Sequence, residues 1–314
     1  MATKAVLVTG ATGKQGGSVI NALLNQSSTK FSILAVTRDA TSASAQRLAA
    51  KSPTIELVQG NLDDVSAIFK EAHKLCREPV WGVYSVQVSM GKDVTFESEV
   101  RQGKTLIDES IKEGVEHFVY SSVERGGDEA SWDNQTPIPH FQSKYHIERH
   151  LREVTGNGQP GAKMGWTILR PVAFMDNLEP GFPTKVFMAA MRNWLGDKPV
   201  QWVATSDIGV FAAKAFTHPE NWDRRAVGLA GDELAPDQMG DAFKNATGRP
   251  MPMAYSLFGS ALTYMVTELR LMIGWFASDG YQADIPARRR DHPEMLNMET
   301  WLKRESHFEA KGQT

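Results

Sequence analysis

Residues 5–17 read AVLVTGATGKQGG, an apolar strand-like run that passes directly into spaced glycines. A helical pattern follows over residues 18–24, so the glycines lie where a strand gives way to a helix. Gly10 permits a tight turn, Gly13 lets the backbone approach a pyrophosphate, and Gly16 lets the helix pack closely on the strand. N–H groups at the start of the helix would bind the anion. The predicted cofactor contacts in this turn are Gly10, Thr12, Gly13, Lys14, Gln15 and Gly16.

The glycine spacing has two residues between successive glycines, which departs from the usual one-then-two pattern of dinucleotide turns. The alternative is a glycine-rich turn without a ligand. The position between a strand and a helix favours the dinucleotide.

Strand-like and helix-like segments alternate through the first 170 residues. The expected strands cover residues 5–9, 32–36, 55–58, 81–86, 117–121 and 166–170, and helical patterns cover 65–75, 100–113 and 144–154. Such alternation is typical of βαβ units, whose right-handed crossovers build a parallel sheet. We expect an α/β fold with a doubly wound, parallel Rossmann-type sheet in a cofactor-binding domain over residues 1–175. A smaller C-terminal α/β substrate lobe is expected over residues 176–314, with late elements returning to the sheet.

The end of the second expected strand decides which dinucleotide binds. Arg38 and Asp39 stand at this end. A guanidinium pairs with a ribose 2′-phosphate, whereas a carboxylate accepts from the 2′-hydroxyl and repels the phosphate. Arg38 therefore favours NADP(H). If the strand ended one residue later, Asp39 would be the hydroxyl acceptor and would indicate NAD.

Two further strand ends are expected to contact the cofactor. Polar residues after the third strand would face adenine, and Asp63 or Asp64 is expected to cap the next helix. The end of the fourth strand would pass beneath the adjoining ribose and phosphates. The predicted contacts at these two ends are Asn61, Leu62, Asp63, Ser85 and Gln87.

Composition narrows the class of protein. The chain has 314 residues, of which 41% are hydrophobic and 23% charged, and its formal net charge is −3. These values are typical of a folded globular protein and give no general attraction to nucleic acid or anionic membranes. The basic run Arg288–Arg290 is followed by Asp291 and is expected to be a solvated surface rather than a nucleic-acid patch.

Cysteine content and hydropathy indicate the compartment. With one cysteine, Cys76, and no apolar leader after Met1, we expect a cytoplasmic protein. Leu257–Phe276 is the longest apolar stretch, but Glu268 and Arg270 interrupt it. We expect a buried helix there and no membrane span.

Short motifs are spread over nearly the whole chain. They are Gln102-Gly103-Lys104, His117–Ser122, Lys144 with Ile147-Glu148, Arg170-Pro171 with Phe174–Asn177, Asp207-Ile208-Gly209 and Trp301-Leu302. Together with the glycine turn, these motifs resemble the NmrA-like family of atypical short-chain dehydrogenases, which is similar to isoflavone-reductase-like enzymes. The resemblance implies NADP(H) binding. It also implies one of two functions, a reductase or a cofactor-sensing regulator.

The proton-donating pair of ordinary short-chain dehydrogenases is altered in this chain. In those enzymes a tyrosine and a lysine four residues later share a helix face, and the lysine lowers the pKa of the tyrosine. Here Lys144 is present and His140 replaces the tyrosine. The resemblance implies that Lys144 is the general acid or that it only anchors the nicotinamide ribose. His140, between Pro139 and the helix, is expected in an exposed loop, as an acid–base group or a surface histidine.

Other residues are expected beside the nicotinamide. Ser121 ends the fifth strand, where its hydroxyl either holds a substrate carbonyl or satisfies the local backbone. After the sixth strand, Pro171 and Phe174 would run past the nicotinamide face, and Asn177 would turn toward the pocket. No metal is expected, because the sequence has no zinc-ligand spacing.

These features support three hypotheses. The first is an NADPH-dependent oxidoreductase that reduces a bulky apolar or aromatic metabolite of secondary metabolism, in a pocket lined partly by residues between Met251 and Phe276. The second is an NADP(H)-sensing regulatory protein that acts through protein partners, which the missing tyrosine supports. The third is a cyclase derived from a short-chain dehydrogenase, in which the cofactor pocket shapes the substrate. A small-molecule substrate is the expected partner, and a homodimer or a protein partner stays open.

Overall fold

The computed structural model describes residues 3–89, 91, 94–257, 259 and 266–310, and the chain forms two compact units. The first unit comprises residues 1–122, 142–170 and 206–227, and the second comprises 123–141, 171–205 and 228–314. Both units therefore contain segments that are distant in the sequence. The boundary expected near residue 175 stays a prediction.

A seven-stranded sheet in the order β3-β2-β1-β4-β5-β6-β9 organises the first unit. All five adjoining strand pairs from β3 to β6 are parallel. Because the order runs outward from β1 in both directions, the sheet is doubly wound, with its switch point between β1 and β4. This confirms the predicted fold class. The strands are β1 (Lys4–Val8), β2 (Phe31–Thr37), β3 (Ile55–Gln59), β4 (Val80–Ser85), β5 (His117–Ser121), β6 (Gly165–Pro171) and β9 (Arg225–Leu229).

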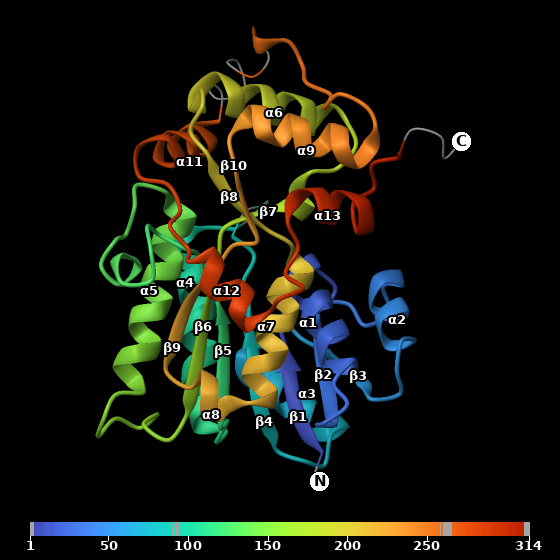
Figure 1. The fold of residues 1–314 in the computed structure, drawn as a ribbon. Coiled ribbons are helices and arrows are strands. Elements are labelled where there is room, and N and C mark those ends of the chain that lie inside the picture. Colours follow the sequence, from blue (N-terminus) through green and yellow to red (C-terminus); the bar gives the residue numbers. More distant parts are fainter. Residues whose placement is uncertain (1–2, 90, 92–93, 258, 260–265, 311–314) are drawn as a thin grey trace. The chain divides into compact units, whose positions relative to one another are not determined.

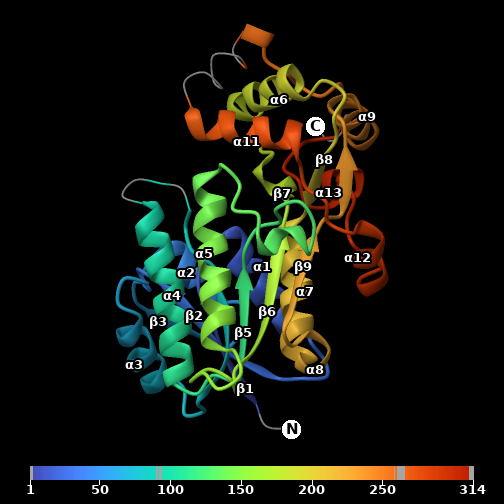
Figure 2. The ribbon, with the colours of Figure 1, turned by 90° about the vertical axis from the view of Figure 1, so that its left-hand side faces the viewer.

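Helices cover both faces of this sheet, with α3, α4 and α5 on one face and α1 and α7 on the other (Figures 1 and 2). Glycines allow the helices to approach: a Cβ on Gly103 would lie 2.4 Å from Ile147 Cδ1, and one on Gly209 would lie 2.5 Å from the Ser18 carbonyl oxygen. Asp64 caps α3, as one of the two alternatives predicted. The helices are α1 (Lys14–Leu24), α2 (Ala43–Ala49), α3 (Val65–Leu75), α4 (Phe96–Lys112), α5 (Pro139–Val154), α7 (Thr205–Thr217) and α8 (Pro219–Trp222).

Three helices begin earlier than the apolar pattern predicted, at residues 14, 96 and 139 rather than 18, 100 and 144. In α4, Thr95 and Ser98 form a capping box that satisfies N–H groups before the apolar pattern starts. In α5, Pro139 is the first helical residue, where its missing N–H costs nothing. As a result, Glu99 and His140 lie on helices instead of in loops.

The second unit contains a three-stranded sheet in the order β10-β8-β7. Strand β8 (Val200–Val203) pairs antiparallel with β10 (Asp232–Leu234) and parallel with β7 (Ala173–Phe174). Helix α6 packs against α9 and α11, and α9 packs against α13 (Figure 1). This mixed sheet with helices confirms the predicted smaller α/β lobe. Its helices are α6 (Phe182–Leu195), α9 (Pro236–Thr247), α11 (Thr267–Ser278), α12 (Ile285–Asp291) and α13 (Met298–Arg304), with 3₁₀ turns at Ala130–Trp132 and Met175–Asn177.

Two expectations about the second unit were wrong. Arg288 is buried, 5% exposed, and lies 3.2 Å from Asp291 on the same helix, so the basic run is not uniformly solvated. Leu257 is 76% exposed and α11 begins only at Thr267, so residues 257–276 are not one buried helix. Phe258 and residues 260–265 of the expected pocket lining lie outside the described residues. No helix in the described part of the chain is long and apolar enough to cross a bilayer.

Buried His117 makes stability depend on pH. Its Nε2 lies 3.0 Å from Thr167 Oγ1, which itself donates to the Trp222 carbonyl, so Nε2 carries the proton. Burial lowers the pKa of His117 to about 4. The neutral form is therefore favoured in the fold, and the associated stability is present above pH 6.5 and lost as pH falls toward 4.

We expect the wild-type chain to lose about 2 kcal/mol more than His117→Gln between pH 8 and pH 5, because the variant has no imidazole to protonate. Urea unfolding at the two pH values measures this difference. An equal loss in both proteins would contradict the assignment to His117.

Candidate functional site

The glycine turn joins β1 to α1 at the carboxyl end of the strand. Gly10 has φ of +59°, a left-handed conformation that residues with a Cβ rarely adopt. Gly13 is the N-cap of α1 and makes no side-chain cap, and Thr12 and Lys14 beside it are exposed. A Cβ on Gly16 would lie 2.3 Å from the Gly10 carbonyl oxygen, so only glycine fits there. The turn can receive an anion at the N-terminus of the helix.

The side chain of Gln15 connects this turn to the neighbouring strands. Its Oε1 accepts hydrogen bonds from Ser121 Oγ at 2.6 Å and from Tyr84 Oη at 3.4 Å. Ser121 is 1% exposed, and its hydroxyl bonds to a side chain of the turn. The structure thus brings together a residue predicted for the diphosphate and one predicted for the substrate.

Arg38 and Asp39, at the end of β2, differ in their hydrogen bonding. Arg38 is exposed and has no hydrogen-bond or ion-pair partner among the described residues. Asp39 Oδ1 accepts from the Thr41 N–H at 2.8 Å and from Thr41 Oγ1 at 2.6 Å. The Thr41 hydroxyl and N–H hold the pKa of Asp39 below its usual range. The carboxylate therefore stabilises the loop before α2, whereas the guanidinium is available to an anion.

Asp63, after β3, lies in a polar cluster with α4. Its Oδ1 accepts from Arg101 Nη2 at 2.8 Å and from Gln102 Nε2 at 3.0 Å, and its Oδ2 accepts from Asn61 Nδ2 at 3.1 Å. The bonds from Gln102 and Arg101 lower the pKa of Asp63. Leu62 is half-buried. These contacts hold the loop after β3 in one conformation, with Asp63 ionised.

Gln87 lies just beyond the end of β4 and is 5% exposed. Its Nε2 donates to Ser85 Oγ at 2.9 Å. Its Oε1 is buried and has no hydrogen-bond partner in the part of the chain that the structure describes. An unsatisfied buried oxygen costs about 1–3 kcal/mol, which a ligand hydroxyl donating to it would recover.

Lys144, on α5, is paired with a carboxylate of α4. Its Nζ donates to Glu99 Oε1 at 2.9 Å, and the two side chains are 11% and 2% exposed. Ser89 Oγ donates to the same oxygen at 2.9 Å, and Ser143 Oγ donates to Oε2 at 2.6 Å. Sequence reasoning missed Glu99, although the Thr95 capping box could have shown that the helix begins before it.

His140 belongs to the second unit and lies in the first turn of α5. Its Nδ1 is 2.6 Å from Glu268 Oε1 of α11, and its side chain is 12% exposed. The predicted exposed loop is therefore wrong, because the helix starts at Pro139 and α11 covers the imidazole. A carboxylate at Nδ1 fixes the ring orientation, as second partners of acid–base histidines do. No pattern in the sequence predicted that Glu268 would pair with His140.

Three residues predicted beside the nicotinamide also belong to the second unit. The Pro171 carbonyl at the end of β6 accepts from the Glu124 N–H at 3.1 Å. Phe174 is half-buried in β7, and Asn177 is exposed at the end of a 3₁₀ turn. Their contact with a cofactor stays a prediction.

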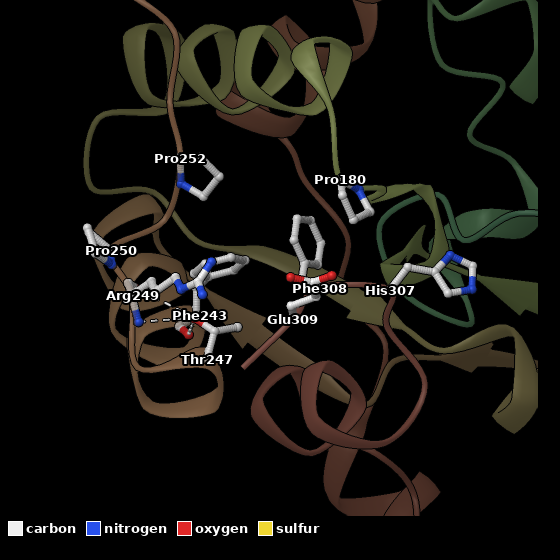
Figure 3. Close-up of a pocket in the computed structure, with 9 residues that line it drawn as sticks. All are labelled: Pro180, Phe243, Thr247, Arg249, Pro250, Pro252, His307, Phe308 and Glu309. Carbon is white, nitrogen blue, oxygen red and sulfur yellow. Dashed lines mark hydrogen bonds between the residues drawn. The ribbon is translucent and has the colours of Figure 1, made fainter. Parts of the chain in front are cut away.

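A hollow of about 340 Å³ lies in the second unit (Figure 3). Phe243 and Phe308 meet edge-on there with ring centroids 5.0 Å apart, and His307 Nδ1 is 2.8 Å from Glu179 Oε2. No residue predicted for cofactor binding or catalysis lines this hollow, whereas Pro252 lines it and falls within the expected pocket range from Met251 to Phe276. Among the described residues, no three His, Cys, Asp or Glu side chains are grouped to hold a metal. The lining residues are Pro180, Phe243, Thr247, Arg249, Pro250, Pro252, His307, Phe308 and Glu309.

The sheet order and the glycine turn define a doubly wound fold of the Rossmann-type class. A family model described as the NmrA-like family matches residues 2–301. The chain belongs to the NmrA-like family, as its motifs predicted.

Relatives and solved structures match over almost the full chain. The NmrA-like family domain-containing oxidoreductase lnbB of Aspergillus flavus is 26% identical over 349 aligned residues, covering 96% of this chain and 98% of that protein. NmrA, a negative transcriptional regulator in complex with NADP, has a TM-score of 0.66 at 19% identity, covering 96% and 94%. Triphenylmethane reductase of Citrobacter sp., complexed with NADP(H), has a TM-score of 0.70 at 16% identity, covering 96% and 99%. The two structures share the fold of this chain.

Proposed function

We propose that this chain is an NADP(H)-dependent oxidoreductase. Its substrate would be a bulky apolar or aromatic metabolite of secondary metabolism. The contrast at the end of β2 carries the proposal: Arg38 has no partner among the described residues, while Asp39 is engaged by its own loop. Several fungal relatives named as oxidoreductases support the enzyme class. A reductase of an aromatic dye shares the fold, which supports a bulky substrate.

The residues of the first unit fit a dinucleotide at three points. The N-terminus of α1 at Gly13 would bind the diphosphate, Arg38 would pair with the 2′-phosphate, and the unpartnered Oε1 of Gln87 would accept from a ribose hydroxyl. When bound, the cofactor would supply the hydride. Lys144 Nζ would donate a hydrogen bond to a ribose hydroxyl, or it would transfer a proton to the substrate heteroatom that becomes negatively charged on reduction.

Lys144→Ala is expected to lower turnover by about 10²- to 10⁴-fold, the contribution of a positioned proton donor. Loss of NADPH absorbance with a panel of imines, enones and ketones measures turnover, and calorimetry of NADPH binding to the same variant is the control. A wild-type chain that binds NADPH but consumes none across the panel would contradict the reductase. Product formation that survives in Lys144→Ala would favour the cyclase.

A second candidate function is an NADP(H)-sensing regulator that acts through a protein partner. The replacement of the usual tyrosine by His140 favours it, as does the fold shared with a regulator in complex with NADP. A sensor must bind its partner with different affinities in the oxidised and reduced cofactor states. Equal affinities in a titration of both states would exclude this function.

A further inference from the structure

The Glu99 carboxylate accepts hydrogen bonds from three side chains. Ser89 Oγ and Lys144 Nζ donate to Oε1, each at 2.9 Å, and Ser143 Oγ donates to Oε2 at 2.6 Å. Glu99 is 2% exposed and stands in the first turn of α4, where the helix dipole attracts negative charge. Hydrogen bonds of this kind are strongest to an ionised acceptor. The site is therefore built for a charged carboxylate.

Within the residues that the structure describes, the Nζ atom of Lys144 is bound to the protein through one hydrogen bond, the one to Glu99. An ammonium has three N–H donors, and Glu99 Oε1 is the hydrogen-bond acceptor of Nζ among the described residues. Two donors of Nζ have no acceptor in the described part of the chain and remain for a ligand or water. Because the side chain of Lys144 is only 11% exposed, its ion pair determines where these two donors point.

A second buried ion pair on the same helix provides a matched comparison. Glu148, one turn beyond Lys144, accepts from Arg170 Nε at 3.1 Å and from Nη2 at 2.7 Å. The two side chains are 1% and 0% exposed. In this bidentate pair one N–H group of the guanidinium meets each carboxylate oxygen, whereas Lys144 donates to a single oxygen of Glu99.

We propose that Glu99 is the positioning residue for Lys144. Its carboxylate holds the ε-amine in place and directs the two remaining N–H donors toward bound cofactor and substrate, while Ser89 and Ser143 hold the carboxylate. The inference rests on the proposed function, since it assigns Glu99 a task in the same site.

The test compares Glu99→Gln with Glu148→Gln, both at a temperature where circular dichroism shows folded protein. Each change removes a buried charge at nearly constant volume, so both should lower the melting temperature. We expect the NADPH dissociation constant to rise about fivefold or more in Glu99→Gln and to change by less than about twofold in Glu148→Gln. In a Lys144→Met background, Glu99→Gln should add less than about twofold, because its effect passes through Lys144.

A second measurement needs no cofactor. Cyanate carbamylates a lysine amine whose nitrogen is free to attack it, and the hydrogen bond to Glu99 holds Nζ in place. Mass spectrometry should show Lys144 modified about fivefold faster in Glu99→Gln, and at the wild-type rate in Glu148→Gln.

If Glu99→Gln does not fold, Ser143→Ala serves as the second variant. It removes the shortest hydrogen bond to the Glu99 carboxylate without leaving a charge unpaired. It should shift NADPH affinity and the carbamylation rate in the same direction by a smaller factor.

Equal NADPH affinity and equal carbamylation in Glu99→Gln and Glu148→Gln would overturn the proposal and leave Glu99 as a residue that only stabilises the fold. Absence of NADPH binding by the wild-type chain would instead contradict the proposed function. In that case, faster carbamylation of Lys144 in Glu99→Gln would still support positioning, so the two failures are distinguishable.

Discussion

Arg38→Ala is expected to bind NADPH about 10- to 100-fold more weakly than the wild-type chain, with NADH affinity unchanged. The reason is that only NADPH carries the 2′-phosphate with which the guanidinium would form charge-assisted hydrogen bonds. The side chain is exposed and has no partner in the described part of the chain, so its removal should hardly change the melting temperature. Calorimetry with each dinucleotide measures the two affinities.

Asp39→Asn is the matched control for this prediction. The asparagine retains an oxygen that can accept from Thr41, so the loop before α2 should keep its conformation. We expect both dinucleotides to bind within about twofold of the wild-type affinities. Weaker NADH binding in Asp39→Asn together with unchanged NADPH binding in Arg38→Ala would reverse the assignment and make Asp39 the acceptor of a ribose hydroxyl.

Glu148→Ala is expected to cause the largest loss of stability, about 3–5 kcal/mol in the free energy of unfolding. The substitution leaves the guanidinium of Arg170, which is 0% exposed, without its bidentate partner inside the first unit. Urea unfolding measures the loss. The double variant Glu148→Met/Arg170→Met should recover much of it, because no charge is then buried unpaired. A loss below about 1 kcal/mol would contradict this view of the pair.

Helix α5 shows which physical contacts are made by the motif residues on which the family resemblance rests. Along α5, Lys144 pairs with Glu99, Ile147 fills the space opposite Gly103, and Glu148 pairs with Arg170. The residue types of this motif could be recognised in the sequence, but their partners could not. These partners come from α4 and β6, and no local pattern links them to α5.

Helix boundaries were the weakest part of the sequence prediction. Apolar periodicity located α3 correctly but placed the starts of α1, α4 and α5 too late. These helices begin with glycine, polar capping residues or proline, which add no apolar side chains to the periodic pattern. The late start for α4 hid Glu99, and the late start for α5 put His140 in a loop.

The sequence by itself determined the doubly wound α/β fold and the glycine turn. Strand and helix periodicity and the conformational freedom of Gly10 are local properties of the sequence. They can therefore be recognised without knowing the tertiary contacts. Tertiary structure alone decided that Asp39 is bonded to its own loop, while Arg38 has no partner in the part of the chain that the structure describes. It also decided that Lys144 is paired with Glu99, 45 residues away in the chain. These outcomes depend on which donors and charges the folded chain brings within hydrogen-bond distance, and that is a property of the tertiary structure.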